Sequence, residues 1–205
     1  MGIRNVFLGF RFKLIHMPSY FQSQTFTSAD FESKPFIKGE YESCTFKGAD
    51  LANADLSGSV FIECEFLGCN LSMANLFKTA FREVKFKDCK LLGLRFDKCE
   101  IIGLVLGFEN CVLDHASFFR TKLQKTVFKN CRLKEADFSE ADFSASVFDG
   151  SDLSGAVFDN TVLEKADFRQ ASNFNIDPER NRIKKAKFAL VGLPGLLGKY
   201  GIEIG

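Results

Sequence analysis

The chain repeats a large apolar residue at every fifth position over most of its length. From Phe26 to Ile101 each fifth residue is Phe, Tyr, Leu or Ile, and the series resumes from Phe108 to Phe168. A helix would spread such residues around its surface, and a strand would place them on alternating faces. The chain is therefore expected to turn a corner within every five residues, with the large residues pointing inward.

The position two before each large residue is also restricted. From Cys111 to Ala166 it holds only Cys, Ala, Thr or Ser, and from Cys44 to Cys99 the one large exception is Leu94. If both positions point inward, three of every five side chains remain outside. This division allows a narrow rod to have an almost wholly apolar interior.

Four such corners would close a square coil, and the corresponding 20-residue period is present. Two extra residues between Ile101 and Phe108 shift the register once, and we interpret them as a bulge at one corner near residues 102–107. Coils stacked about 4.8 Å apart predict seven to eight coils and a rod on the order of 35–40 Å long. One column of large residues then comprises Phe26, Phe46, Phe66, Phe86, Phe108, Phe128, Phe148 and Phe168.

The sequence around these positions resembles that of a known protein family. The runs ADLANADLSGSVF, ADFSEADFSASVF and SDLSGAVF are similar to the A(D/N)Lxx pattern of pentapeptide-repeat proteins, over residues 21–170. The resemblance implies an all-β solenoid, a right-handed quadrilateral parallel β-helix. It implies little about function, because one fold serves many functions.

The two ends of the chain depart from the repeat. Residues 1–20 are expected to be an arm that is disordered, non-native upstream of Met17, or a surface-binding amphipathic segment. Residues 171–205 are expected to form a loop, a partial coil and a short helix opened by Pro194. This segment covers the last coil as a plain cap or as cap plus dimer contact, through Leu196, Leu197, Tyr200, Ile202 and Ile204.

Reactive chemistry is not indicated by the sequence. All seven Cys occupy the small inward position, which predicts reduced core thiols, and His16 and His115 are the only histidines. We find no phosphate loop, catalytic triad or metal signature, so we expect no enzyme, no cofactor and no metal. Without a signal peptide or an apolar stretch of membrane-spanning length, we expect a cytoplasmic protein that does not bind a membrane.

Charge changes sign along the chain, and therefore along the predicted rod. The net charge is −5 from Asp30 to Glu65, +7 from Lys78 to Lys134 and −8 from Glu135 to Asp167. The basic zone contains interleaved carboxylates, so we interpret it as a mixed surface that does not bind nucleic acid directly.

The tail also resembles the quinolone-resistance (Qnr) and microcin-immunity branch of the family. That resemblance implies a DNA-mimicking homodimer that engages DNA gyrase or topoisomerase IV and modulates or protects against quinolone or peptide poisons. The basic zone departs from a continuous anionic mimic, so an interaction scaffold with another protein partner is the alternative. The candidate contacts form an acidic face of Asp137, Asp142, Asp149, Asp152 and Asp159, with the bulge as a specificity feature.

Overall fold

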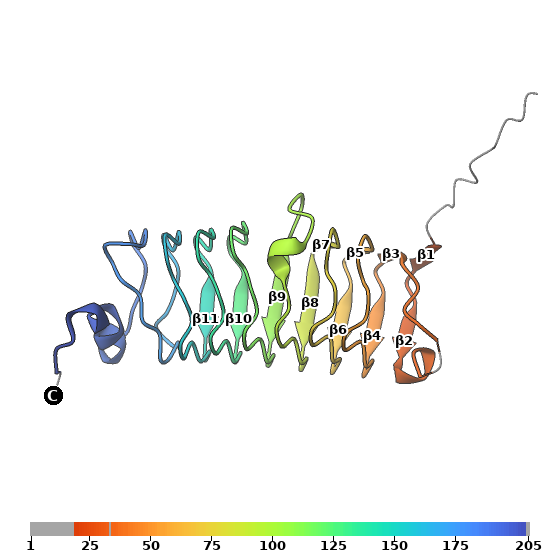
Figure 1. The fold of residues 1–205 in the computed structure, drawn as a ribbon, viewed down its shortest axis with the longest axis horizontal. Helices are drawn as coiled ribbons and strands as arrows, with labels where there is room; N and C mark the ends of the chain where they lie inside the picture. Colours follow the sequence, from red (N-terminus) through yellow and green to blue (C-terminus); the bar gives the residue numbers. More distant parts are fainter. Residues whose placement is uncertain (1–18, 33, 204–205) are drawn as a thin grey trace, which may run out of the picture.

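The computed structural model describes residues 19–32 and 34–203, which wind into a straight rod (Figure 1). Side 1 of the rod carries a four-stranded parallel sheet in the order β1-β3-β5-β7. Tyr41 pairs with Phe61 and Phe61 with Phe81, so neighbouring strands are offset by one 20-residue coil. The strands are β1 (Ser19–Gln22), β3 (Gly39–Glu42), β5 (Val60–Ile62) and β7 (Ala80–Arg82).

Side 2 carries a seven-stranded parallel sheet that runs along most of the rod, in the order β11-β10-β9-β8-β6-β4-β2. Side 3 is held by isolated parallel bridges such as Asn70↔Lys90, and side 4 by bridges such as Ser117↔Asp137. The predicted right-handed, four-sided parallel β-helix is confirmed. The strands of side 2 are β2 (Thr25–Thr27), β4 (Thr45–Lys47), β6 (Glu65–Leu67), β8 (Val84–Lys87), β9 (Leu106–Glu109), β10 (Val127–Lys129) and β11 (Val147–Asp149).

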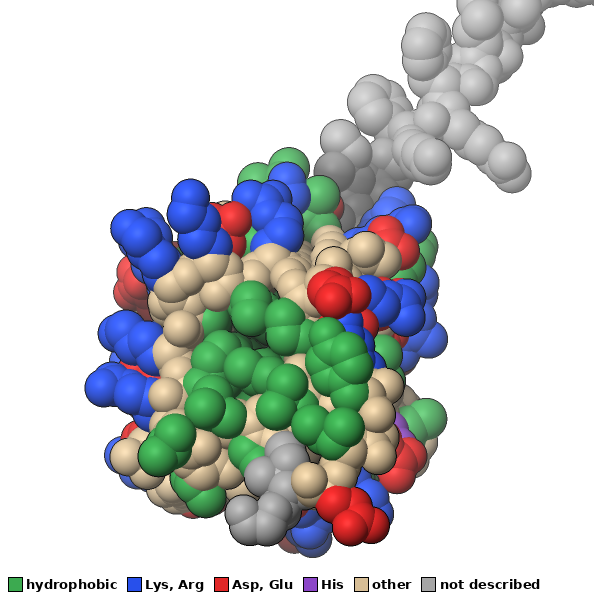
Figure 2. Space-filling view, turned by 90° about the vertical axis from the view of Figure 1, so that its left-hand side faces the viewer, with side chains coloured by type: hydrophobic (Ala, Val, Ile, Leu, Met, Phe, Trp, Pro, Cys, Tyr) green, Lys and Arg blue, Asp and Glu red, His purple; other side chains and the backbone are tan. Residues whose placement is uncertain are grey.

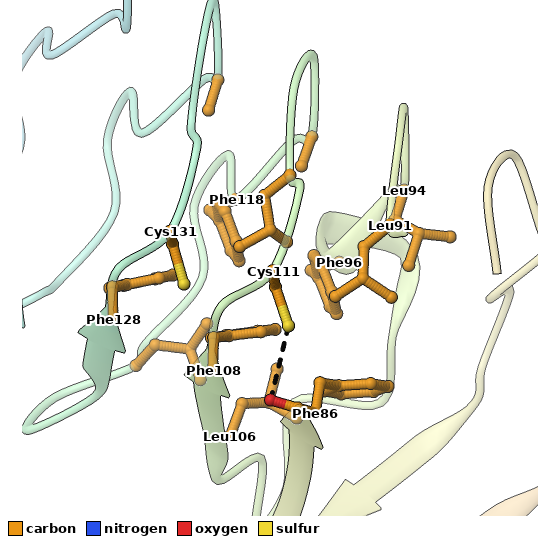
Figure 3. Close-up of a cluster of buried hydrophobic side chains, with 14 of the residues drawn as sticks. Phe86, Leu91, Leu94, Phe96, Leu106, Phe108, Cys111, Phe118, Phe128 and Cys131 are labelled. Atoms are coloured by element: carbon orange, nitrogen blue, oxygen red, sulfur yellow. Dashed lines mark hydrogen bonds between the residues drawn. The ribbon is translucent and has the colours of Figure 1, made fainter. Parts of the chain in front are cut away.

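The core is a set of stacked aromatic columns. Phe108 and Phe128 lie parallel with ring centroids 5.0 Å apart, and neighbouring columns meet edge to face. The predicted column from Phe26 to Phe168 is present, and Phe188 extends it by one more coil. Figure 3 shows Phe86, Phe108 and Phe128 in sequence along this column. Stacking stabilises these rings beyond what their burial contributes, so repeating the same aromatic residue in every coil is favourable.

The small inward position also has a hydrogen-bonding role. Thr79, Ser146 and Ser151 each donate a hydroxyl hydrogen bond to a carbonyl 23 residues earlier, on the preceding coil. Thiols act in the same way, since Cys111 Sγ lies 3.4 Å from the Phe86 carbonyl (Figure 3). This position therefore requires a small side chain and, in many coils, one that can donate a hydrogen bond.

The register shift falls slightly earlier than predicted. Val84 pairs with Leu106, whereas Glu100 N–H still bonds to Thr79 in the ordinary register, so the extra residues lie between Glu100 and Val105. They form a loop that projects from the rod above β7 (Figure 1), next to the short 3-10 helix η2 (Phe96–Lys98). The prediction that Ile101 belongs to the core is wrong.

Burial at the insertion shows what replaces that residue. The side chain of Ile101 is 68% exposed, while those of Leu104 and Leu106 are buried. Beyond the insertion the Phe column regains its phase, with Phe86 and Phe108 stacked at 5.5 Å. The insertion is a local bulge, and the apolar interior passes through it without a break.

The carboxyl-terminal end continues the coil beyond Phe168. Arg182 and Lys187 still pair with Val162 and Asp167, and buried Asn181 donates to the Phe158 carbonyl as a small inward residue would. The chain then forms two short 3-10 helices. These are η3 (Leu190–Leu196) and η4 (Gly198–Tyr200), and besides η2 a further 3-10 helix, η1 (Ser28–Asp30), lies near the other end.

The capping contacts differ from those expected. Pro194 lies inside η3 instead of opening it. Leu196 packs against the core, but Leu197, Tyr200 and Ile202 are exposed. The last coil is covered mainly by buried Phe174 and Ile176, which η3 overlies at Gly192 and Gly195. The structure does not describe Ile204, His16 or residues 1–18 of the predicted arm. Among the described residues, no helix has the length and apolar character needed to cross a membrane.

Candidate partner-binding surfaces

The five predicted acidic residues do not share one face of the rod. Asp142 lies on side 1, Asp149 on side 2 and Asp152 on side 3, whereas Asp137 and Asp159 lie on side 4. They follow one another around the coil within a short length of the chain. The predicted acidic face is thus a band of carboxylates around the rod.

Three of these carboxylates have a structural role in addition to their charge. Asp137, Asp142 and Asp152 each accept a hydrogen bond from the backbone N–H two residues later, at 2.9, 2.9 and 3.1 Å. This Asx turn stabilises the corner of the coil. Asn70 and Asn75 form the same contact in other coils, so the turn requires the side-chain oxygen but not the charge.

Local hydrogen bonds favour the ionised form of two of these acids. Burial raises the pKa of Asp142, but hydrogen bonds from Ser144 and Gln124 outweigh it and leave the pKa below its usual value. Hydrogen bonds from Ser154 and Asn173 likewise lower the pKa of Asp152. Both side chains are therefore fully charged at neutral pH.

Ion pairing separates the five acids further. Asp159 pairs with Arg180 at 2.7 Å, whereas no described basic side chain pairs with the other four. Arg182 and Arg169 similarly pair with Glu164 and Asp167. We did not predict these pairings from the sequence, although Arg180 and Asp159 stand about one coil apart and the 20-residue period could have revealed them. The uncompensated charge is concentrated at Asp137, Asp142, Asp149 and Asp152.

Internal ion pairs neutralise part of the basic zone. Arg132 contacts the buried carboxylate of Asp114 at 2.8 Å, and Arg95 contacts Asp97 at 2.7 Å. His115 lies on the surface, with Nδ1 3.4 Å from Glu135. This pattern agrees with the interpretation of a mixed-charge surface.

The insertion and the carboxyl-terminal end expose apolar side chains. At the insertion, Ile101, Ile102 and Val105 are 68%, 74% and 51% exposed. Figure 2 shows the carboxyl-terminal end, where apolar side chains gather across the middle of the surface. Such exposed apolar patches are candidate interaction surfaces. The exposed large residues of the end are Leu190, Val191, Leu193, Leu197, Tyr200 and Ile202.

The thiols pack in the core of the rod. All seven Cys are buried and free, as their inward positions predicted. Burial raises the pKa of Cys64 to about 11, and contact with Cys131 raises the pKa of Cys111 to about 12. Thiols with such pKa values are protonated and poorly nucleophilic. Within residues 19–32 and 34–203, no group of His, Cys, Asp and Glu could hold a metal ion.

The repeated five-residue coil, with its exposed surfaces, is typical of a pentapeptide-repeat solenoid. Family models agree: residues 42–76 match the model described as pentapeptide repeats (8 copies), and residues 121–196 match that described as a pentapeptide repeat region. The chain belongs to the pentapeptide-repeat family. No curated protein matches the sequence.

Solved structures show the same fold. Two trypsin-treated variants of QnrB1, described as a plasmid-mediated fluoroquinolone resistance protein, align with a TM-score of 0.59 and 20% sequence identity. The alignments cover 92% and 93% of this chain and 99% of each QnrB1 chain. At this identity the likeness establishes the fold alone.

Proposed function

We propose that this protein is a non-catalytic binding protein that engages the DNA-binding surface of a type II topoisomerase, DNA gyrase or topoisomerase IV. The observation that carries the proposal is the band of uncompensated carboxylates at Asp137, Asp142, Asp149 and Asp152. Surfaces that bind DNA are rich in Lys and Arg and interact mainly with phosphate charge. A rod with fixed anionic groups on several sides is electrostatically complementary to such a surface.

A second element of the proposal is a homodimer through the carboxyl-terminal end. The apolar surface in Figure 2 lies one to two coils beyond the acidic band, so an end-to-end dimer would place two acidic bands on either side of its centre. Val191 and Tyr200 are 89% and 56% exposed and lie on this surface. Replacing both with Glu should convert a dimer into a monomer, as measured by light scattering during gel filtration.

The proposal implies a mechanism of binding without chemistry. The acidic band steers the protein to the topoisomerase and competes with DNA there, which would relieve a complex trapped by a quinolone or a peptide poison. The exposed Ile101 and Ile102 would contact a pocket beside the DNA site and provide specificity. The similarity of the fold to QnrB1 supports this proposal without identifying the partner.

The test is a gyrase supercoiling assay with a fluoroquinolone, titrated with this protein. The variant Asp137→Asn/Asp142→Asn/Asp152→Asn removes three charges but keeps the oxygen that accepts each turn hydrogen bond. Because exposed charge pairs contribute modestly, protection or inhibition should require roughly tenfold more of the variant. A matched control is Asp50→Asn, which occupies the same repeat position near the other end and should behave as wild type.

An unchanged titration for the triple variant, with its thermal midpoint preserved, would contradict the role of the acidic band. No effect of the wild-type protein at micromolar concentration on gyrase and topoisomerase IV would favour the scaffold alternative. In that alternative, the exposed apolar loop at Ile101 and Ile102 would insert into a pocket of another protein. A pull-down that loses its partner with Ile101→Ser/Ile102→Ser would then identify the contact.

A further inference from the structure

One outward position on side 2 lacks a side chain. The outward column that crosses this sheet contains Gly107 between Lys85 of β8 and Val127 of β10. The missing side chain opens a groove of about 780 Å³, the size of an ordinary small-molecule site. The full column reads Thr25, Thr45, Glu65, Lys85, Gly107, Val127 and Val147.

The fold does not require glycine at this position. Gly107 is not in the left-handed region, and an added Cβ would meet only Lys85 Cγ, at 4.0 Å. Glycine within a strand is less favourable than alanine, because it loses more backbone freedom on folding. The backbone conformation therefore does not explain the glycine at position 107, whereas the groove that it leaves open does.

Lysine side chains line both walls of the groove, and Val127 lies between two of them. One wall is formed by Lys85 and Lys87, and the other by Lys125, Val127 and Lys129. The flanking strands are two spacings apart, roughly 9.6 Å between backbones, which leaves room for one flat ring between their side chains. Lysine stems supply apolar contact along the walls while their ammonium groups stay at the rim.

Four lysines and three carboxylates, Glu65, Asp88 and Glu109, line the groove, so its charge is net positive. Glu109 is the single carboxylate between Lys87 and Lys129, at 3.7 and 3.3 Å. Lys85 pairs with Glu65 at 3.7 Å, and Lys125 has no ion-pair partner among the described residues. An entering carboxylate would meet the ammonium groups of Lys125 and Lys129 on one wall, and its apolar body would replace the missing side chain above Gly107.

We propose that this groove binds a flat aromatic carboxylate, with the ring between Lys85 and Val127 and the carboxylate near Lys125 and Lys129. The groove lies in the basic zone of the rod, apart from the acidic band and the apolar end. The proposal therefore does not depend on topoisomerase binding.

The test is an NMR titration of the wild-type protein with 2-naphthoate. The amide signals of Gly107, Val127 and Lys129 should shift in a saturable manner. Gly107→Leu should weaken binding at least about tenfold by filling the groove. Thr45→Leu adds the same side chain in the same outward column two strands before Lys85, and it should leave binding unchanged.

The cationic contribution is tested separately. Lys125→Gln/Lys129→Gln should weaken 2-naphthoate about three- to tenfold, and the neutral 2-naphthylmethanol should bind wild type correspondingly less well. Equal binding of the neutral compound would overturn the assignment of an anion. Absence of shifts at Gly107 and Val127, or saturable shifts confined to residues 190–202, would overturn the site itself, even if Gly107→Leu failed to fold.

Discussion

At the scale of single residues, the small inward position combines tight packing with hydrogen bonding. Ser151 donates to the Phe128 carbonyl at 3.2 Å and accepts from the Cys131 N–H at 3.1 Å. Ser59 occupies the equivalent position on another side and is equally buried, but its hydroxyl has no hydrogen-bond partner among the described residues. The same residue type therefore has opposite energetic consequences at two repeat positions.

This difference predicts opposite effects of one substitution. Ser151→Ala should lower the free energy of unfolding by about 1–3 kcal/mol, because it leaves a buried N–H without its partner. Ser59→Ala removes an unsatisfied hydroxyl and should be neutral or stabilising by up to about 1 kcal/mol. Urea unfolding of the two variants measures both values. Equal destabilisation by the two substitutions would show that the hydrogen bonds do not decide the outcome.

Because several carboxylates have lowered pKa values, we expect the fold to lose stability in acid. A hydrogen bond from Lys38 lowers the pKa of Asp55 to about 2, and contacts with Arg169 lower that of Asp167. A lowered folded-state pKa stabilises the fold above the unfolded pKa of about 4, and this stabilisation is lost as the pH falls toward 2. The urea midpoint at constant ionic strength should therefore fall over this interval. Asp55→Asn should reduce the size of the fall, and an unchanged pH profile for this variant would contradict the contribution of Asp55.

At the scale of the repeating element, the corner decides which residues are tolerated. Most five-residue elements place one residue in the left-handed region, as at Gly58 with φ 73° and Ala145 with φ 58°. Asn and Asp stabilise the corner by accepting from the backbone, and glycine avoids the steric cost of a positive φ. The five-residue period thus reflects backbone geometry as well as the apolar core.

Two glycine substitutions distinguish these effects. Gly58→Ala should destabilise by about 1–2 kcal/mol, since its Cβ has free space and only the backbone conformation is unfavourable. Gly107→Ala, at an extended strand position, should be neutral or stabilising by about 0.5–1 kcal/mol. Thermal and urea unfolding give both values. A larger loss for Gly107→Ala than for Gly58→Ala would refute this account of the corner.

At the scale of the whole molecule, the sequence was sufficient for the coil but not for its surface. The Phe columns could be predicted because a period of five with a 20-residue repeat has one simple three-dimensional solution. Ile101 was misplaced because the repeat cannot show which residues an insertion expels, and Leu104 was overlooked for the same reason. The acids from Asp137 to Asp152 were assigned to one face because charge was followed along the chain, whereas each five-residue step moves to the next side.

The insertion also has a mechanical consequence. The sheet on side 1 ends at β7, and bridges on that side resume only between Lys122 and Asp142, while sides 2, 3 and 4 remain paired past the loop. Within the described chain, no side-1 bridge joins the coil that carries the insertion to either neighbouring coil, and only the Glu100–Thr79 and Val105–Phe81 backbone hydrogen bonds connect it to the preceding coil on that side. If the rod is stretched from its ends in an optical trap, it should yield first at this coil and extend in two steps. Deleting the two extra residues would merge the steps and make the rod respond to force as a single spring.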